Sequence, residues 1–515
     1  MLPEFRNEPF TDFSRPENRT AMEEALKKVK SELGKKYPVV IGGVKTFTNE
    51  TFDSINPGRT SEIIGTFSKV DREMANKAIE TAASAFESWR FVSPDQRARY
   101  LLKAAASIRR RKFEFAAVMV YEVSKSWAEA DGDIAETIDF LEFYAREMMR
   151  IGSPQPVTSY TGEENELYYI PLGVCAVIPP WNFPCAIMAG MTSAAIVAGN
   201  TVVLKPASTS PYIAWKFFEV MEEVSLPAGV LNFVPGDGGA IGDTIIDHPK
   251  TRLIAFTGSK AIGLRIQERA AKVNPGQIWI KRTILEMGGK DFILVDEHGD
   301  IEAAAEGIVA AAFGFQGQKC SACSRAIVHE KVYDAIVEKV VARTKTLKVG
   351  NPEEYGVFMG AVIDSKAHKS IMEYVESGKK DGRCLTGGKK GSEEGYFIEP
   401  TVIADVPPTA KIACEEIFGP VLAIIKCKSF DEGIAIANGT EYGLTGALYT
   451  SNRAHLERGR RELHCGNLYL NRKCTGALVG VHPFGGFNMS GTDSKAGGRD
   501  YLLLFTQAKS VSERF

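Results

Sequence analysis

A long run of residues without a charged side chain, 167–204, most constrains how this chain can fold. The run is long enough to raise the question of a membrane span. Prolines at positions 171, 179, 180 and 184 interrupt it, and in lipid such breaks would leave backbone groups without hydrogen-bond partners. We therefore expect the run to be buried inside the protein and not to lie in a membrane.

The same run divides into a β-α-β unit. β-branched residues predict strands over 174–178 and 201–204, with a proline-bounded loop over 179–184 and a helix over 186–198 between them. Short apolar runs continue at helix-length intervals, at 231–235, 253–256 and 283–286. Strands that alternate with helices in this way favour a parallel sheet with right-handed crossovers.

A second series of predicted strands follows, at 292–295, 325–329, 421–426 and 446–450, with helices such as 301–313 and 331–347 between them. The predicted fold class is α/β, with two open-sheet lobes in tandem. The segment 152–172 and the tail 503–515 are extended and poor in helix signals.

The amino-acid composition and the charge balance exclude several classes of protein. Of 515 residues, 44% are hydrophobic and 24% are charged, which excludes a disordered, collagenous or coiled-coil chain. The balance of 62 basic against 64 acidic residues argues against a nucleic-acid partner. Nine cysteines without framework spacing, and an N-terminus without a secretory pattern, make the reducing cytoplasm the expected location.

Cys320 lies in a glycine-rich connection, 314–323, between a predicted helix and a strand. An accessible thiolate there would be a good nucleophile towards a carbonyl, although a structural loop cysteine is an equally open interpretation. Cys323 completes a C-x-x-C pair, but the seven histidines are scattered singly and no second pair exists, so no metal site is expected. Cys323 is also placed to trap an oxidised Cys320 as a disulfide.

Two further side chains suit carbonyl chemistry. Glu286 ends a hydrophobic strand at a glycine pair, where open parallel sheets place ligands, and apolar surroundings would raise its pKa towards that of a general base. A strand-end glutamate paired with Lys290 is the alternative. Asn182, between two prolines and two aromatic residues, can donate to a developing oxyanion or can serve turn formation alone.

Phosphate-binding signals come from turns between strands and helices. Gly258 and Ser259 follow a predicted strand and Gly263 lies in the next helix, so backbone N–H groups and the Ser259 hydroxyl can hold a pyrophosphate at a helix N-terminus. Lys205 also ends a strand and can reach a ribose. Ordinary turn and helix-cap chemistry explains both segments equally well, and the glycines at 236–242 miss the G-x-G-x-x-G spacing by one residue.

Seven short motifs, taken in order, resemble those of the aldehyde dehydrogenase superfamily over about residues 41–505. They are PWNFP at 180–184, KPA at 205–207, FTGS at 256–259, EMGGK at 286–290, GQKC at 317–320, EEIFGP at 415–420 and PFGG at 483–486. Seven ordered matches are far more specific than any one of them.

What the resemblance implies is a thioester mechanism. Cys320 would attack an aldehyde carbonyl, with the oxyanion between the Asn182 amide and the Cys320 backbone N–H. After hydride transfer to a nicotinamide, Glu286 would activate the water that hydrolyses the thioester. The implied cofactor is NAD, and the corresponding contact positions are Ile178, Trp181, Lys205, Ser208, Gly258, Ser259, Gly263, Gly288, Glu416 and Phe418.

Within the superfamily the chain most resembles the 1-pyrroline-5-carboxylate dehydrogenases, through NRKCTGALVG at 471–480 and the serine after the nucleophile. The resemblance implies that Ser321, Gly476 and Ala477 hold a substrate α-carboxylate, with Phe183 and Phe484 beside the aliphatic chain. The implied small-molecule reaction is oxidation of L-glutamate 5-semialdehyde to L-glutamate in proline or arginine degradation.

Three other interpretations stay open from the sequence. The chain could oxidise another semialdehyde or an aliphatic aldehyde, it could be a catalytically silent protein on this scaffold, or it could be a reductase of glutamyl phosphate. The Gly476-Ala477 pair argues against the first, and retention of Cys320, Glu286 and Asn182 argues against the second. A reductase needs no hydrolytic water, so Glu286 argues against the third.

The resemblance also implies a division of the chain. Residues 1–151 and 173–287 correspond to a Rossmann-like dinucleotide-binding domain, and residues 288–487 to a catalytic domain. Residues 152–172 and 488–515 correspond to an oligomerisation flap and tail, which implies a homodimer or larger homo-oligomer. Ser208 stands where many NAD-preferring members carry glutamate, so we expect tolerance of NADP beside NAD.

Overall fold

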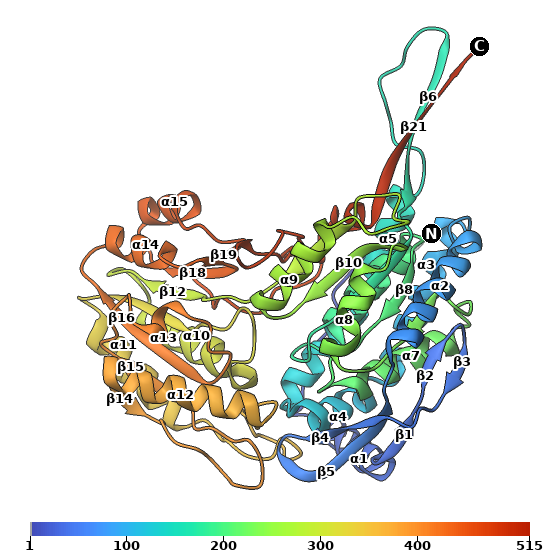
Figure 1. Cartoon of the computed structure of the whole chain (residues 1–515). Helices are drawn as coiled ribbons and strands as arrows, with labels where there is room; N and C mark the ends of the chain where they lie inside the picture. The colour runs from blue at the N-terminus through green and yellow to red at the C-terminus, as the bar shows by residue number, and fades with distance from the viewer. Residues whose placement is uncertain (1–2) are drawn as a thin grey trace.

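The structure, a computed structural model that describes residues 3–515, consists of two α/β lobes and a projecting two-stranded ribbon (Figure 1). Each lobe is built around a seven-stranded sheet. The sheet of the first lobe ends in sequence at β11 (Arg282–Glu286), and that of the second begins at β12 (Phe292–Val295). The segment between these two strands carries the EMGGK motif from one lobe to the other.

The first sheet has the strand order β11-β10-β7-β8-β9-β2-β3. The five strands from β11 to β9 are parallel, whereas β2 and β3 are antiparallel additions at one edge. The remaining bounds are β10 (Thr251–Thr257), β7 (Val174–Ile178), β8 (Thr201–Leu204), β9 (Leu231–Phe233), β2 (Val39–Ile41) and β3 (Val44–Thr46).

Nine helices in the described residues belong to this lobe, and a three-stranded sheet of order β1-β5-β4 flanks it. The helices are α1 (Pro16–Glu32), α2 (Arg72–Trp89), α3 (Pro94–Arg110), α4 (Lys112–Val123), α5 (Trp127–Ile151), α6 (Ala186–Val197), α7 (Pro211–Glu223), α8 (Gly238–Asp247) and α9 (Lys260–Ala271). The flanking strands are β1 (Lys35–Tyr37), β4 (Thr51–Asn56) and β5 (Arg59–Ser68).

The second sheet has the order β14-β15-β16-β13-β12-β18-β19, and only β14 is antiparallel to its neighbour. Its other strands are β15 (Thr401–Ala404), β16 (Val421–Cys427), β13 (Arg325–His329), β18 (Thr445–Tyr449) and β19 (Asn467–Leu470), with β14 at Arg383–Thr386. Its helices are α10 (Ile301–Phe313), α11 (Tyr333–Lys345), α12 (Ser365–Asp381), α13 (Lys411–Cys414), α14 (Phe430–Asn438) and α15 (Arg453–Glu462). A short pair of strands, β17 (Tyr442–Gly443) and β20 (Phe487–Asn488), lies beside it.

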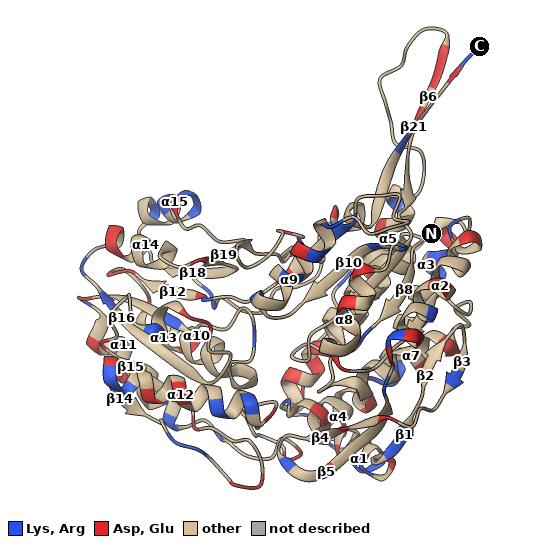
Figure 2. Ribbon diagram, viewed as in Figure 1, with Lys and Arg blue, Asp and Glu red and all other residues tan. Residues whose placement is uncertain are grey.

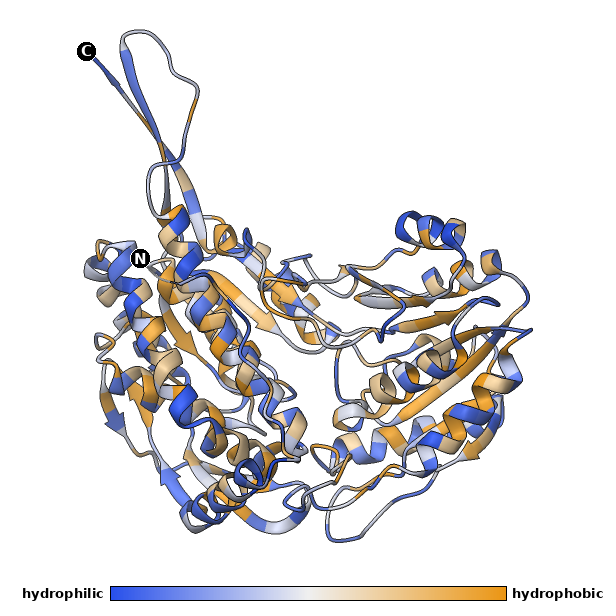
Figure 3. Ribbon diagram, turned by 180° about the vertical axis from the view of Figure 1, so that it is seen from behind, coloured by the Kyte–Doolittle hydropathy of each residue, from blue (hydrophilic) through white to orange (hydrophobic). Residues whose placement is uncertain are grey.

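The structure confirms the predicted α/β class and two lobes. The uncharged run 167–204 forms the end of β6 and then β7, α6 and β8, and every residue of α6 except Ile187 is buried. The hydropathy of the residues agrees with burial of the sheets, because the central strands of both sheets are among the most hydrophobic ribbons in Figure 3. No helix within residues 3–515 is both long and apolar enough to cross a membrane.

The ribbon pairs β6 (Glu163–Pro171) with β21 (Thr506–Arg514) along nine residues (Figure 1). The tail is not extended from residue 503, as the sequence suggested, because a 3₁₀ turn covers Tyr501–Phe505 and packs into the core of the first lobe. Residues 488–505 return to the first lobe through contacts such as the Gly497 N–H donated to the Tyr144 hydroxyl.

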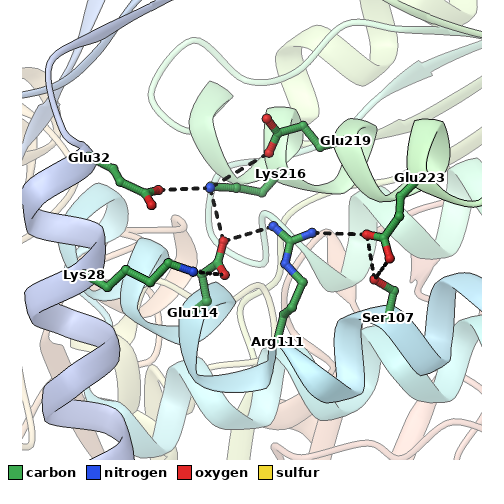
Figure 4. A network of polar contacts seen from close by, with 8 residues as sticks. All are labelled: Lys28, Glu32, Ser107, Arg111, Glu114, Lys216, Glu219 and Glu223. Carbon is green, nitrogen blue, oxygen red and sulfur yellow. Dashed lines mark hydrogen bonds and ion pairs between the residues drawn. The ribbon is translucent and has the colours of Figure 1, made fainter.

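Charged residues of both signs are interspersed over the two lobes (Figure 2). One cluster ties three helical segments of the first lobe together (Figure 4). The Lys216 ammonium on α7 lies 3.1 Å from Glu114 of α4 and 3.3 Å from Glu32 of α1. Arg111, between α3 and α4, bonds the same Glu114 carboxylate at 2.9 Å. The network therefore joins α1, α4 and α7 through Lys216 and Glu114.

Candidate active site

Two cavities meet at Cys320. The smaller, of about 130 Å³, is lined by Glu286 and by residues of α5, α6 and the loop after β19. The larger, of about 570 Å³, is lined by the loop after β7, the start of α9 and residues 416–418. Cys320 lines both, so one sulfur atom is reached from two chambers.

The predicted site residues divide between these cavities. The five residues predicted to contact substrate all line the smaller one, namely Phe183, Ser321, Gly476, Ala477 and Phe484. The larger one is lined by the oxyanion candidate and six predicted cofactor residues, namely Asn182, Trp181, Gly258, Ser259, Gly288, Glu416 and Phe418.

Cys320 follows an unusual turn. After α10 ends, Phe315, Gln316 and Gly317 have φ values of 49°, 57° and 67°, so three consecutive residues are left-handed. Left-handed backbone is unfavourable for residues with a side chain and persists only where the surroundings fix it. The Gln316 side chain fixes it in part, because its amide donates to the Ser124 carbonyl at 3.0 Å and to the Ala361 carbonyl at 2.8 Å.

The Cys320 side chain is half-buried. Desolvation, followed by the carboxyls of Asp291, Glu416 and Glu286, raises the pKa of the Cys320 thiol well above its ordinary value. These neighbours favour the thiol over the thiolate, so the proton must leave before or during attack on a carbonyl. A base near the sulfur is therefore required.

Glu286 ends β11 at the edge of the smaller cavity. Its carboxylate accepts hydrogen bonds from the Ser494 hydroxyl at 2.6 Å and from the Ser494 and Gly486 backbone N–H groups at 3.2 Å. Desolvation nevertheless raises the pKa of Glu286 to about 7. The structure does not support the alternative pairing with Lys290, because no ion pair joins these two side chains among residues 3–515 and the buried Lys290 ammonium has no hydrogen-bond partner there.

Asn182 is buried in the loop after β7 and donates its amide to the Gln318 carbonyl at 3.1 Å. The bond crosses from the first lobe to the segment that carries Cys320. The side chain therefore does more than stabilise its own turn, which was the alternative interpretation, and it holds an amide donor close to the nucleophile.

The larger cavity has the features that a dinucleotide requires. Trp181 and Phe418 form aromatic walls with ring centroids 5.5 Å apart, and Ser259 is the N-cap residue of α9, although its side chain makes no capping bond. A helix N-terminus of this kind is suited to phosphate. The Glu416 carboxylate, which accepts from the Gly289 N–H at 2.9 Å, offers an acceptor for ribose hydroxyls.

Gly288 is required beside this carboxylate, since a Cβ there would come within 2.2 Å of a Glu416 oxygen. The residues of the larger cavity thus fit NAD.

Four predicted cofactor residues do not line the larger cavity, namely Ile178, Lys205, Ser208 and Gly263. Lys205 is buried at the end of β8, where its ammonium donates to the Pro206 carbonyl at 3.1 Å. Ser208 donates to the Gly236 carbonyl at 3.3 Å. Met287 packs closely against Gly263, because its sulfur would lie 2.5 Å from a Cβ added at position 263. The closest neighbour of Gly263 is therefore a protein side chain.

Sequence reasoning missed Glu136. It lies on α5 and lines the smaller cavity, where desolvation and then the nearby Asp133 raise its pKa to about 8. A signal was present, since Glu136, Phe140 and Tyr144 recur at helical spacing and all line this cavity. Because α5 carries many charged residues, this spacing alone did not show which face of the helix points into the protein.

The second cysteine of the C-x-x-C pair is buried. The Cys323 thiol donates to the Arg325 carbonyl at 3.5 Å and also contacts Cys474. No group of three or more metal-ligating side chains occurs within the part of the chain that the structure describes. A disulfide between Cys320 and Cys323 stays a prediction, which mass spectrometry after peroxide treatment would contradict by finding no such crosslink.

The comparisons with known proteins decide the family, because the aldehyde dehydrogenase family model matches residues 44–511. The chain belongs to the aldehyde dehydrogenase family. It is 59% identical to a protein of Geobacillus sp. (strain WCH70) and 58% identical to one of Anoxybacillus flavithermus, in both cases over 100% of each chain. Both relatives are named 1-pyrroline-5-carboxylate dehydrogenase.

Among solved structures, the chain resembles the 1-pyrroline-5-carboxylate dehydrogenase from Thermus with bound NAD. The identity is 50%, the TM-score is 0.98 and 100% of each chain is covered. An aldehyde dehydrogenase from Bacillus cereus shares 32% identity with a TM-score of 0.89, covering 95% of this chain and 98% of that one. This aldehyde dehydrogenase is thus similar to named relatives along its full length.

Proposed function

We propose that this aldehyde dehydrogenase oxidises L-glutamate 5-semialdehyde, the open form of 1-pyrroline-5-carboxylate, to L-glutamate with NAD. The observation that carries the proposal is the position of Cys320 between two cavities, the smaller of which is lined by Gly476 and Ala477. The names of the full-length relatives support the same substrate. In the overall reaction the aldehyde loses a hydride and gains a hydroxyl from water.

In the first half of this reaction Cys320 adds to the aldehyde carbon as its thiol proton passes to water in the cavity and from there to solvent. The oxyanion that forms is stabilised by the Asn182 amide and by the Cys320 backbone N–H, which are donors fixed before the reaction starts. NAD in the larger cavity would accept the hydride of the adduct. Cys320 is left as a thioester, which carries the oxidation state of the acid.

In the second half Glu286 takes a proton from water, which attacks the thioester. A carboxyl with a pKa of about 7 exists as carboxylate and acid in comparable amounts near neutral pH, which suits a general base. Its bonds to Ser494 and Gly486 hold the carboxylate at the cavity edge. Release of the acid restores the Cys320 thiol.

The smaller cavity supports an amino-acid substrate. The loop at Gly476, with φ +82°, can present backbone N–H groups to an α-carboxylate together with the Ser321 side chain. The Glu136 carboxyl in the same cavity offers a hydrogen-bond acceptor for an α-ammonium group. Phe183 and Phe484 supply the apolar surface for the carbon chain between the two ends.

The first experiment follows NADH absorbance with pyrroline-5-carboxylate, propanal and succinic semialdehyde, on wild type and on Cys320→Ala. We expect the highest kcat/KM for pyrroline-5-carboxylate and no activity in the variant. A higher kcat/KM for either other aldehyde would contradict the carboxylate anchor and leave the thioester chemistry in place. Unchanged activity in Cys320→Ala would overturn the assignment of the nucleophile.

The protein is also proposed to act as a homo-oligomer in the cytoplasm and to tolerate NADP. The ribbon of β6 and β21 projects from the first lobe, and the connection between α9 and β11 exposes Val273, Ile278 and Ile280 by 65%, 85% and 80% (Figure 1). Exposed apolar groups of this kind suit a partner subunit.

All nine cysteines are free thiols, which fits a reducing compartment. Ser208 presents no carboxylate that would repel a 2′-phosphate.

A further inference from the structure

The left-handed turn before Cys320 needs more support than Gln316 alone provides. Phe315 heads this turn, and its side chain is completely buried. Two of its three left-handed residues, Phe315 and Gln316, carry side chains and are therefore costly, so the surroundings must favour this one conformation strongly. The position of the Cys320 sulfur between the two cavities depends on that turn.

Behind the Phe315 ring lies Lys125, a lysine with no exposed surface. Its ammonium lies 4.0 Å from the ring centroid of Phe183 and 4.5 Å from that of Phe315. The two rings meet edge to face with centroids 6.5 Å apart. A desolvated cation over an aromatic face is attracted by the ring quadrupole, and here a single cation serves two rings.

Asp133 on α5 holds this cation. The Lys125 ammonium donates to one Asp133 oxygen at 2.8 Å, and both side chains are completely buried. The other Asp133 oxygen accepts the Ala186 backbone N–H at 2.7 Å, at the start of α6. Lys125 is therefore fixed to both α5 and α6, the two helices that line the smaller cavity.

Residues next to Lys125 and Asp133 reach the same turn. The Ser124 carbonyl accepts from Gln316, and the Ser124 hydroxyl accepts the Ala361 N–H at 2.9 Å. One helical turn before Asp133, Glu129 forms an ion pair of 2.7 Å with Lys319, the residue before the nucleophile. The connection between α4 and α5, together with the first turn of α5, thus contacts the segment 315–319 at three points.

A buried ion pair is weak grounds for stability, because desolvation of both charges offsets their attraction, and an apolar pair of similar volume often does as well. Lys125 differs from a merely structural lysine in two of its contacts. Phe315 begins the turn that carries the nucleophile, and Phe183 lines the substrate cavity. The position of Lys125 explains how these two rings are held in one arrangement.

We propose that Lys125 is a positioning residue for Cys320, because its ammonium, held by Asp133, clamps the Phe315 and Phe183 rings and so fixes the left-handed turn that carries the sulfur. This inference rests on the proposed role of Cys320 as nucleophile, and it assigns a role to a residue that contacts neither cavity. Loss of the cation frees the turn, and the sulfur then samples positions from which hydride transfer is slow.

The test measures single-turnover NADH formation at saturating NAD with pyrroline-5-carboxylate and with propanal. In Lys125→Met we expect the rate per folded site to fall about 30-fold or more with both aldehydes, because small misplacements of reacting atoms have effects of this order. We expect the KM for NAD to change less than about twofold, since the larger cavity is not lined by Lys125.

The matched control is Lys216→Met, which removes another largely buried lysine and breaks its bonds to Glu114 and Glu32 in the network of Figure 4. It should lower the thermal midpoint and leave the single-turnover rate within about twofold of wild type. Equal rates per folded site in Lys125→Met and Lys216→Met would overturn the proposal.

A second variant keeps the test decisive if Lys125→Met folds poorly. Phe315→Leu leaves the Lys125–Asp133 pair in place and removes the ring, and we expect a rate loss similar to that of Lys125→Met. The double variant should lose no more than about twofold beyond either single variant, because both act through one contact. Strictly multiplicative losses would overturn the proposal.

Wild type that oxidises propanal but not pyrroline-5-carboxylate would contradict only the proposed substrate, and the variant comparison with propanal would still apply.

Discussion

Burial raises the pKa of Glu286, whereas hydrogen bonds from Ser494 and Gly486 and the nearby Lys495 cation favour the carboxylate. We predict that Glu286→Gln stops turnover at the thioester. Steady-state turnover should fall by about a hundredfold or more, while one NADH per Cys320 site still forms in a burst. Rapid-mixing absorbance checks this prediction, and loss of the burst together with turnover would assign Glu286 to the first half of the reaction instead.

The same carboxyl gives a pH dependence. Its pKa in the folded protein is about 7, and the carboxylate is the form that accepts a proton from water. Turnover limited by thioester hydrolysis should therefore rise as pH increases through about 7 and fall towards tenfold per pH unit well below it. A profile of kcat between pH 5.5 and 8.5 measures this. A profile that stays flat across this range would contradict the assigned base.

Ser208 gives a prediction about the cofactor. Its hydroxyl, in the loop after β8, donates to the carbonyl of Gly236, which follows β9. A glutamate there would place a charge where a 2′-phosphate approaches, so Ser208→Glu should lower the NADP to NAD ratio of kcat/KM by about tenfold or more. Ser208→Gln is the matched control, with similar size and no charge. Equal ratios in both variants would mean that position 208 does not contact the ribose.

At the residue scale the sequence predicted which side chains meet, although their roles stay predictions. Cys320, Glu286 and the five substrate residues do line one cavity. The turn at Phe315 and Gln316 could not be predicted, since neither residue type favours left-handed backbone. The role of Lys125 could not be predicted either, because its partners Asp133 and Phe315 come from segments that only tertiary packing brings together.

At the scale of elements, α7 begins without a cap from its own sequence. Ser210 makes no capping bond, and instead the buried Glu122 of α4 accepts the Tyr212 and Ile213 N–H groups at 2.6 and 2.8 Å. Glu122→Ala should lower the free energy of unfolding by about 3 kcal/mol, because it leaves buried donors unpaired. Asp71→Ala, which removes the exposed cap of α2, should cost about 1 kcal/mol. Chemical denaturation measures both, and equal losses would contradict the capping role of Glu122.

Most parallel strands were predicted within two residues of their observed bounds, since buried apolar runs between helices give a clear signal. The antiparallel strands β2, β3 and β14 were not predicted. They are short strands at a sheet edge (β3 and β14) or next to one (β2), with little alternation, and their pairing is decided by the sheet that they join. The sheet formed by β1, β5 and β4 was not predicted either.

At the scale of the whole molecule, the ribbon projects from the first lobe, and β21 is exposed from Ala508 to Arg514 (Figure 1). Val511 of β21 faces Glu166 of β6 and is 36% exposed. We predict that removal of residues 507–515 yields a smaller assembly, measured by light scattering. Val511→Glu, which places like charges opposite each other, should weaken the assembly more than Val511→Lys. A truncated protein with the mass of the full assembly would contradict a role for the ribbon.

The pairing of β6 with β21 also has a consequence for synthesis. The two strands are separated by more than 330 residues, so a ribosome that adds roughly 5 to 20 residues per second leaves β6 without its partner for roughly 20 to 70 seconds. During that interval neighbouring nascent chains on one messenger RNA present the same open strand to one another. Glu163, Glu164 and Glu166 give that strand a negative charge, which makes each copy repel the next until β21 emerges.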